Sequence, residues 1–276
     1  MKLYSSIACL LAGTLLFTGC AKKNAPPAEP SSSEPVVVAN RQSVDYAALD
    51  NQTVGWGQGT IVDDANCPVS CAQFSEKYHA YEVLFGGEDR DAPTVCLTFD
   101  EGYENGCTEQ ILDILKQKNC PAVFFVTMDY VKDRPDLVRR MIDEGHTVGN
   151  HTTTHPSMPS VSVEQLKDEI LTLHDHVKEQ FGYEMTLLRP PKGEFSKRTL
   201  AITKDLGYTT VLWSFAYKDW LTDAQPERDA ALNKMLSAAH NDAIYLLHAV
   251  SQTNTAVLGD FIDGMRQKGY TFTAIP

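Results

Sequence analysis

From about residue 93 to the end of the chain, short apolar and β-branched runs alternate with segments in which apolar residues recur every three or four positions. Short continuous runs are typical of strands buried on both faces, whereas the longer spacing places side chains on one face of a helix. The helical spacing is clearest over residues 111–115 and 166–177. Seven runs predict strands, at residues 95–99, 122–126, 147–150, 186–188, 210–213, 244–247 and 270–273.

Three glycines support this alternation of helices and strands. Gly145, Gly207 and Gly269 each stand just before a predicted strand, where the end of a helix favours a residue with a left-handed backbone. Seven strands alternating with six helices indicate a parallel sheet covered by helices. The simplest α/β architecture of this kind is a closed or nearly closed β/α barrel, and an open doubly wound sheet is the alternative.

The N-terminal segment has the pattern of an export signal. A basic start is followed by an apolar stretch from Leu3 to Phe17. Residues 17–20 read F-T-G-C, which resembles the lipobox of bacterial lipoproteins, with Phe17 where Leu is usual. That resemblance implies that residues 1–20 are a signal peptide and that Cys20 carries a lipid anchor, and an uncleaved signal anchor is the alternative. Both interpretations predict an exported, membrane-anchored protein, and the lipoprotein reading places it facing the cell wall.

Residues 21–42 are rich in Ala, Pro, Ser and Glu. A segment of this composition buries too little apolar surface to fold, so we expect a disordered tether there. The folded part of the chain is then residues 43–276. A tether lets that part reach from the membrane toward something fixed nearby, and a cell-wall polymer suits this geometry.

Composition excludes other classes of protein. The 276 residues carry 24 basic and 36 acidic side chains, a net charge of −12, which argues against nucleic acid as a partner because phosphate binding requires clustered Lys and Arg. No internal apolar run is long enough to cross a bilayer. Cys67 and Cys71 are the nearest candidates for a disulfide in an exported domain. Nothing in the sequence predicts a protein partner.

Polar residues follow five of the predicted strands at their C-terminal ends. In a parallel barrel these ends share one face, and the active sites of such barrels lie on that face. Five polar groups in these positions therefore predict a single site. They are Asp100 with Glu101, His151 with His155, Arg189 with Lys192, Asp219 with Trp220, and His248.

His151 and His155 are four residues apart, so a tight loop or helical turn would place both imidazoles on one side. Two imidazoles and a carboxylate make a catalytic zinc site with an open position for water. Asp100 and Glu101 leave their strand in opposite directions, so one carboxylate could reach the metal while the other faces the substrate water. Taken alone, a surface histidine pair and a solvated acidic turn are the commoner interpretations.

His248 ends an apolar strand, and because the ordinary pKa of a histidine lies near neutral pH, this residue could serve as a general acid. Asp219 would orient its ring and stabilise the imidazolium, and Arg189 would keep Asp100 ionised. Trp220 is either a core aromatic or a stacking surface for a sugar ring. Taken alone, a histidine such as His248 is more often a core residue bonded to a carbonyl, and Arg189 would be an ordinary surface ion pair.

In this order, the motifs T-F-D-E-G, H-T-T-T-H, R-P-P-K-G, D-W and L-L-H resemble the five motifs of the NodB-homology polysaccharide deacetylases. The resemblance covers residues 93–276. It implies a distorted seven-stranded (β/α) barrel, the NodB-homology fold, and a metal-dependent enzyme that removes acetyl groups from a glycan. The longer matches T-F-D-E-G-Y-E-N-G, R-P-P-K-G-E-F-S and W-S-F-A-Y-K-D-W resemble the branch that deacetylates N-acetylmuramic acid in peptidoglycan. V-G-W-G at residues 54–57 resembles the lead-in of that branch, so we assign residues 43–92 to the same catalytic domain.

The resemblance also implies the ligands of a divalent metal, which the ligand chemistry suggests is zinc. His151, His155 and the second acid, Glu101, would bind it. Most of the family has Asp in place of Glu101, and the muramic-acid branch often has Asn. Glu101 still offers an oxygen, and a weak third ligand predicts loose metal binding and an activity that responds to added metal.

The remaining implied roles are those of amide hydrolysis. Asp100, held by Arg189, would take a proton from the attacking water. His248, oriented by Asp219, would protonate the departing sugar amine. By analogy with the family, a backbone N–H near Lys192 would stabilise the oxyanion, and Lys192 and Trp220 would contact the substrate.

Two alternatives remain open from the sequence. The same five motifs serve enzymes that act on N-acetylglucosamine in wall glycan or chitin, or on O-acetyl groups of another polysaccharide. A catalytically silent, lipid-anchored glycan-binding protein is the second alternative, and it would require a broken catalytic set, whereas here only the second acid, Glu101, departs from the family.

Overall fold

The computed structural model describes residues 44–275. The predicted signal peptide, lipid anchor on Cys20 and tether all lie outside the described residues. From Val44 onward the chain forms one compact unit. Within residues 44–275, no helix has both the length and the apolar character that a membrane span requires.

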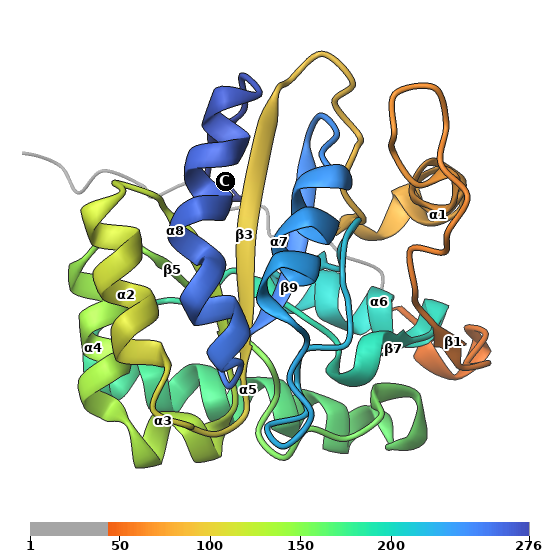
Figure 1. The fold of residues 1–276 in the computed structure, drawn as a ribbon. Helices are drawn as coiled ribbons and strands as arrows, with labels where there is room; N and C mark the ends of the chain where they lie inside the picture. The colour runs from red at the N-terminus through yellow and green to blue at the C-terminus, as the bar shows by residue number, and fades with distance from the viewer. Residues whose placement is uncertain (1–43, 276) are drawn as a thin grey trace, which may run out of the picture. The chain divides into compact units, whose positions relative to one another are not determined.

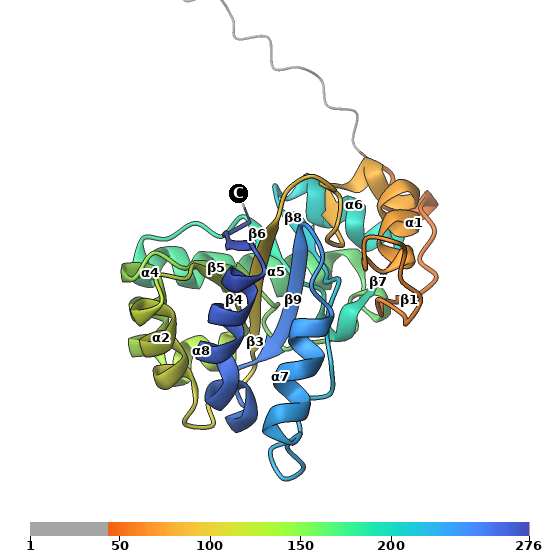
Figure 2. The same cartoon turned by 45° about the horizontal axis from the view of Figure 1, so that its top comes forward.

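A sheet of eight strands forms the centre of this unit, and every strand pairing in it is parallel (Figures 1 and 2). The strand order is β10-β3-β4-β5-β6-β8-β2, and β9 also pairs with β3, outside this path. Each of the seven predicted runs contains a strand or overlaps one in the structure. The strands of the sheet are β2 (Val83–Leu84), β3 (Thr94–Glu101), β4 (Ala122–Val126), β5 (Thr147–Asn150), β6 (Leu187–Leu188), β8 (Thr209–Val211), β9 (Ala243–His248) and β10 (Thr271–Phe272).

The sheet curls back on itself, because the chain that follows β8 lies beside β9. Ser214 N donates to Ile244 O at 2.9 Å, and Leu246 N donates to Phe215 O at 2.8 Å. A single parallel bridge joins Phe215 to Tyr245. The predicted distorted (β/α) barrel is therefore confirmed, and the open doubly wound alternative is wrong. The additional strand β2 is two residues long, too short to be read from an apolar run.

Helices occupy all six crossovers between the seven predicted strands, and Gly145, Gly207 and Gly269 have the expected positive φ values of 82°, 86° and 92°. The α-helices are α1 (Val69–Tyr78), α2 (Thr108–Gln117), α3 (Met128–Asp133), α4 (Pro135–Asp143), α5 (Val163–Phe181), α6 (Lys197–Asp205), α7 (Arg228–Ser237) and α8 (Gln252–Gln267). Short 3₁₀ turns lie at Tyr46–Ala48, His79–Tyr81, Met158–Ser160 and Pro191–Gly193.

Alternate residues of the strands face two separate cores. In β3, Val95, Leu97 and Phe99 pack against the covering helices, whereas Cys96 belongs to the inner core. The same alternation holds along β4 and β9. Which face of its strand a residue occupies therefore decides whether its side chain lies inside the barrel or under the helices.

The segment before β3 packs on the inner core. β1 (Val54–Gly55) pairs antiparallel with β7 (Glu194–Phe195), and Trp56 Nε1 donates to Trp213 O at 2.9 Å. The candidate disulfide between Cys67 and Cys71 is not formed, and all five cysteines of residues 44–275 are free thiols.

Candidate active site

Six of the predicted site residues meet at the C-terminal ends of the strands. Asp100 near the end of β3 and His248 at the end of β9 are register partners in neighbouring strands. β5 and β6 pair through their last residues, so the chain leaves them into His151 and Arg189 side by side. The remaining two, His155 and Asp219, are brought in by contacts with this group, which we describe next.

Arg189 is the structural centre of the site. Its side chain is fully buried, and its Nη1 donates to Asp100 Oδ1 at 2.8 Å and to Thr98 Oγ1 at 2.7 Å. Its Nε and Nη2 donate to the carbonyls of Val211 (3.1 Å) and Leu212 (3.0 Å). A guanidinium with its donors fixed in this way is a rigid positive charge beside the carboxylate.

The environment of Asp100 keeps it ionised. Burial by itself would raise the pKa of the Asp100 carboxyl, but the charge and hydrogen bond of Arg189, with the charges that His151 and His248 carry when protonated, outweigh burial and hold the pKa below its ordinary value. An ionised carboxylate at the edge of a site is the form that accepts a proton.

His151 and His155 lie together, with ring centroids 4.9 Å apart. His151 Nε2 is 3.5 Å from Asp100 Oδ2, and its Nδ1 is 2.8 Å from the carbonyl oxygen of Arg189. Burial lowers the pKa of His151 to about 4 and also places the pKa of His155 below its ordinary value. Both rings are therefore neutral near pH 7, which is the form that binds a metal.

These donors fit a divalent transition metal. Ligating histidines generally fix one ring nitrogen on a carbonyl or carboxylate, as His151 does on Arg189, and leave the other for the metal. Two imidazoles next to the carboxylate of Asp100 match the nitrogen-rich sites of zinc. In residues 44–275, however, no group of three or more His, Cys, Asp or Glu side chains is arranged to hold an ion.

The predicted third ligand is Glu101, and the position of its side chain explains why no such group forms. It follows Asp100 on β3 and therefore takes the opposite face of the strand, under the helices rather than in the barrel. Its side chain is fully buried, and neither carboxylate oxygen has a hydrogen-bond partner. Burial, together with the charges of Glu104 and Asp100, raises the pKa of Glu101 well above its ordinary value. The structure thus does not assemble the predicted ligand set of Glu101, His151 and His155.

His248 and Asp219 form the second charged pair of the site. His248 Nδ1 lies 2.7 Å from Asp219 Oδ1, and the backbone N–H of His248 donates to Asp219 Oδ2 at 2.9 Å. Burial by itself would lower the pKa of His248, but the hydrogen bond and charge of Asp219 outweigh it and raise the pKa above its ordinary value. A protonated His248 across from an ionised Asp100 is an acid–base pair with separated roles.

One residue of this pair's surroundings was missed by the sequence analysis. Asn254, in the first turn of α8, donates from Nδ2 to Asp219 Oδ2 at 2.5 Å, and Tyr217 donates to its Oδ1. Asp219 is fully buried, and this amide supports its second oxygen together with the backbone N–H of His248. No local sequence pattern predicts this contact, because Asp219 and Asn254 are 35 residues apart in the chain.

The two predicted substrate-binding residues lie at the rim. Trp220 is 47% exposed, with its ring 5.5 Å from that of His248, so it is a surface aromatic and not a core residue. Lys192 is exposed in the turn after Arg189 and has a positive φ of 61°. The turn is packed tightly, since a Cβ on Gly193 would come within 2.7 Å of the Trp213 ring.

Comparisons with known proteins agree with this geometry. The family described as polysaccharide deacetylase matches residues 87–211. The peptidoglycan N-acetylmuramic acid deacetylase PdaA of Bacillus subtilis (strain 168) is 40% identical over 229 residues, which are 83% of this chain and 86% of that protein. The peptidoglycan N-acetylglucosamine deacetylase PgdA of Listeria monocytogenes is 34% identical over 183 residues, 66% of this chain and 38% of that protein.

A solved structure extends the agreement to three dimensions. The structure of Bacillus subtilis PdaA, described as a family 4 carbohydrate esterase, superposes with a TM-score of 0.77 at 39% identity. The match covers 82% of this chain and 96% of that one. With its barrel, its ordered motifs and these relatives, the chain belongs to the polysaccharide deacetylase family.

Proposed function

We propose that this protein hydrolyses the N-acetyl group of N-acetylmuramic acid residues in peptidoglycan. The proposal rests on one observation: two ion pairs, Arg189–Asp100 and Asp219–His248, lie on the two sides of one site. Amide hydrolysis requires an ionised base and a protonated acid. Arg189 favours the ionised form of Asp100, and Asp219 favours the protonated form of His248.

Asp100 takes the proton of the attacking water, and Arg189 keeps its carboxylate ionised and fixed while it does so. His248 then donates its proton to the departing amine of the sugar, and Asp219 stabilises the charge that His248 carries before the transfer. A divalent metal on His151 and His155 supplies, when bound, polarisation of the acetyl carbonyl and a lowered pKa of water. The products are acetate and a free amino sugar.

The choice of sugar rests on the relatives. The muramic acid deacetylase of B. subtilis is 40% identical across 83% of this chain, and the glucosamine deacetylase of Listeria is 34% identical across 66%. The longer and closer match supports muramic acid, and glucosamine is the outcome against which it is tested.

Zinc is the metal that the donor set supports best. Two neutral imidazoles favour zinc over magnesium or calcium, which prefer oxygen ligands. With only two histidines as firm ligands, we expect weak binding and an activity that rises on addition of Zn²⁺ to chelator-treated protein. A chelator-treated enzyme that retains full activity would contradict the proposed metal dependence.

We also propose that the protein is exported and anchored to a membrane through a lipid on Cys20. The apolar stretch from Leu3 to Phe17 and the F-T-G-C motif support this location. Cys20→Ala tests it: the variant should lose lipid labelling and leave the membrane fraction. Unchanged membrane association would favour an uncleaved signal anchor.

The decisive test of the activity uses purified peptidoglycan, both intact and stripped of its stem peptides. Mass spectrometry of the digested glycan after incubation with Zn²⁺ and the protein would locate each lost acetyl group. We expect loss from muramic residues. Loss from glucosamine residues alone would retain the fold and the chemistry but overturn the proposed substrate, and no loss from either glycan would favour a silent glycan-binding protein.

A further inference from the structure

The loop that carries both histidines has an unfavourable backbone. Residues 151–156 follow β5, and within them Thr152 and His155 have φ values of 67° and 57°. Neither residue is glycine, and a non-glycine residue in this left-handed region is maintained only where its surroundings hold it. His155 N donates to Thr152 Oγ1 at 3.1 Å, which closes the turn from inside but does not fix it to the barrel.

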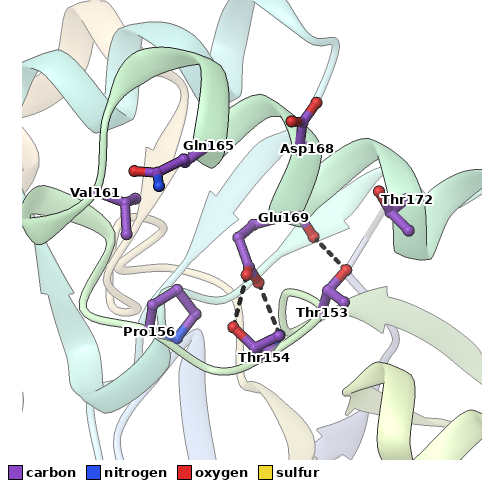
Figure 3. A pocket seen from close by; sticks show the side chains of 8 residues that line it. All are labelled: Thr153, Thr154, Pro156, Val161, Gln165, Asp168, Glu169 and Thr172. Carbon is purple, nitrogen blue, oxygen red and sulfur yellow. Dashed lines mark hydrogen bonds between the residues drawn. The ribbon is translucent and has the colours of Figure 1, made fainter.

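Glu169 in α5 fixes this loop from outside (Figure 3). Its carboxylate oxygens accept two hydrogen bonds from Thr154, from the backbone N–H to Oε2 at 2.7 Å and from the hydroxyl to Oε1 at 2.6 Å. Its backbone carbonyl accepts two more from Thr153, from N at 3.0 Å and from Oγ1 at 2.9 Å. One residue of a long helix thus receives four hydrogen bonds from the middle of the loop between the two histidines.

The outer side of this contact is open. A pocket of about 260 Å³ lies between the loop and α5, and Glu169 lines it together with Gln165, Asp168 and Thr172 of the same helix (Figure 3). Among the described residues, no hydrogen bond joins Asp168 or Thr172 to the loop. Within residues 44–275, the hydrogen bonds that join residues 151–156 to α5 all end on Glu169.

We propose that Glu169 is a positioning residue, which sets the geometry in which His151 and His155 receive the metal. The proposal deepens the proposed function and rests on it, since it requires that these two histidines bind the metal. With few firm ligands available, the affinity of the site depends on how closely both rings are held in place.

The test measures metal affinity by chelator competition in purified full-length protein. Glu169→Ala removes the two carboxylate bonds, and we expect Zn²⁺ to bind about tenfold more weakly, the lower end of the loss seen when support of a ligand is removed. Thr154→Val, which removes only the hydroxyl bond, should show a smaller loss. Glu169→Gln retains an acceptor for the backbone N–H of Thr154 and should recover most of the affinity.

Asp168→Ala is the matched control, because Asp168 lies on the same helix, lines the same pocket and carries the same charge. It should bind Zn²⁺ as the wild type does. The melting temperature of the metal-free protein separates positioning from general support of the fold. For Glu169→Ala it should equal that of Asp168→Ala, while the increase in melting temperature on adding Zn²⁺ becomes smaller.

Three outcomes would contradict the inference. Wild-type affinity in Glu169→Ala would overturn it, and so would a metal-free melting temperature that falls well below that of Asp168→Ala, which indicates a structural role. Equal loss in Asp168→Ala would assign the effect to charge alone. If His151→Ala binds Zn²⁺ as tightly as the wild type, the proposed metal site itself fails, and this result is distinguishable from failure of the positioning role.

Discussion

The two faces of β3 end in neighbouring carboxylates that have opposite environments. On the inner face, Asp100 accepts a hydrogen bond from the buried Arg189 and has a lowered pKa. On the outer face, Glu101 is buried without a hydrogen-bond partner and has a raised pKa. One peptide bond separates them, and strand alternation places them on opposite faces, of which one meets the site and the other the packing under the helices. In this structure the first acid of the motif therefore meets its partners in the site, and the second acid lies on the other face of the strand.

The largest effect is expected when the positive charge of Arg189, which pairs with Asp100 on the inner face of β3, is removed. Arg189→Met leaves the carboxylate of Asp100 without its buried counter-charge and should cost about 3–5 kcal/mol of unfolding free energy, as well as nearly all activity. Denaturant unfolding at pH 7 measures the loss. Arg266→Met replaces an exposed arginine and should change stability by less than about 1 kcal/mol. Similar values for both variants would show that Arg189 is not an essential part of the core.

Replacing each carboxylate by its amide should lower the activity for the residue on the inner face of β3 and leave it nearly unchanged for the residue on the outer face. Asp100→Asn removes the general base and should lower kcat by about 10²–10⁴-fold. Glu101→Gln changes a group that does not face the site, so kcat and the Kd for Zn²⁺ should stay within about threefold of the wild type. Acetate release and chelator competition provide the measurements. Loss of metal binding in Glu101→Gln would instead establish Glu101 as a ligand.

His248, which lies across the site from Asp100, should make the activity depend on pH. A general acid must be protonated, so activity falls as pH rises through the pKa of His248, which Asp219 holds above its ordinary value. Asp219→Asn removes that charge, lowers the pKa of His248 and should move the alkaline limb of the pH–kcat profile to lower pH. Asp223→Asn, an exposed acid in the same loop, should leave the limb in place. An unmoved limb in Asp219→Asn would assign it to another group.

The smallest expected effect concerns stability on the outer face. The pKa of Glu101 is raised from 4.5 on folding, so the folded state binds this proton more tightly than the unfolded state does. Its contribution to stability is therefore full below about pH 4.5 and declines as pH rises toward the folded pKa. Glu101→Gln should become progressively more stable than the wild type between pH 4.5 and 7. Unfolding curves across this range measure the difference, and a constant difference would show that Glu101 is ionised in both states.

Much of the fold was predictable because its signals are local. Each of the seven predicted strands contains an apolar run, and the positive φ values of Gly145, Gly207 and Gly269 follow from the chain reversals between helix and strand. The barrel then followed from the alternation of elements, since parallel strands require crossovers. β2 escaped prediction because it pairs with a strand more than a hundred residues away and is too short to show a period of its own.

The site divides in the same way. The sequence by itself determined which residues stand at the carboxyl ends of the strands, and hence that Asp100, His151, Arg189 and His248 share one face. It also determined that Asp100 and Glu101 point in opposite directions, because the strand period is a property of the backbone.

Only the tertiary structure decided which of those two directions leads into the site. It also decided that Asn254 supports Asp219 and that Glu169 holds the loop of the histidines, contacts that join separate elements of the chain. Such contacts depend on how a helix docks against the barrel, and docking is set by the sum of many packing interactions rather than by any local pattern.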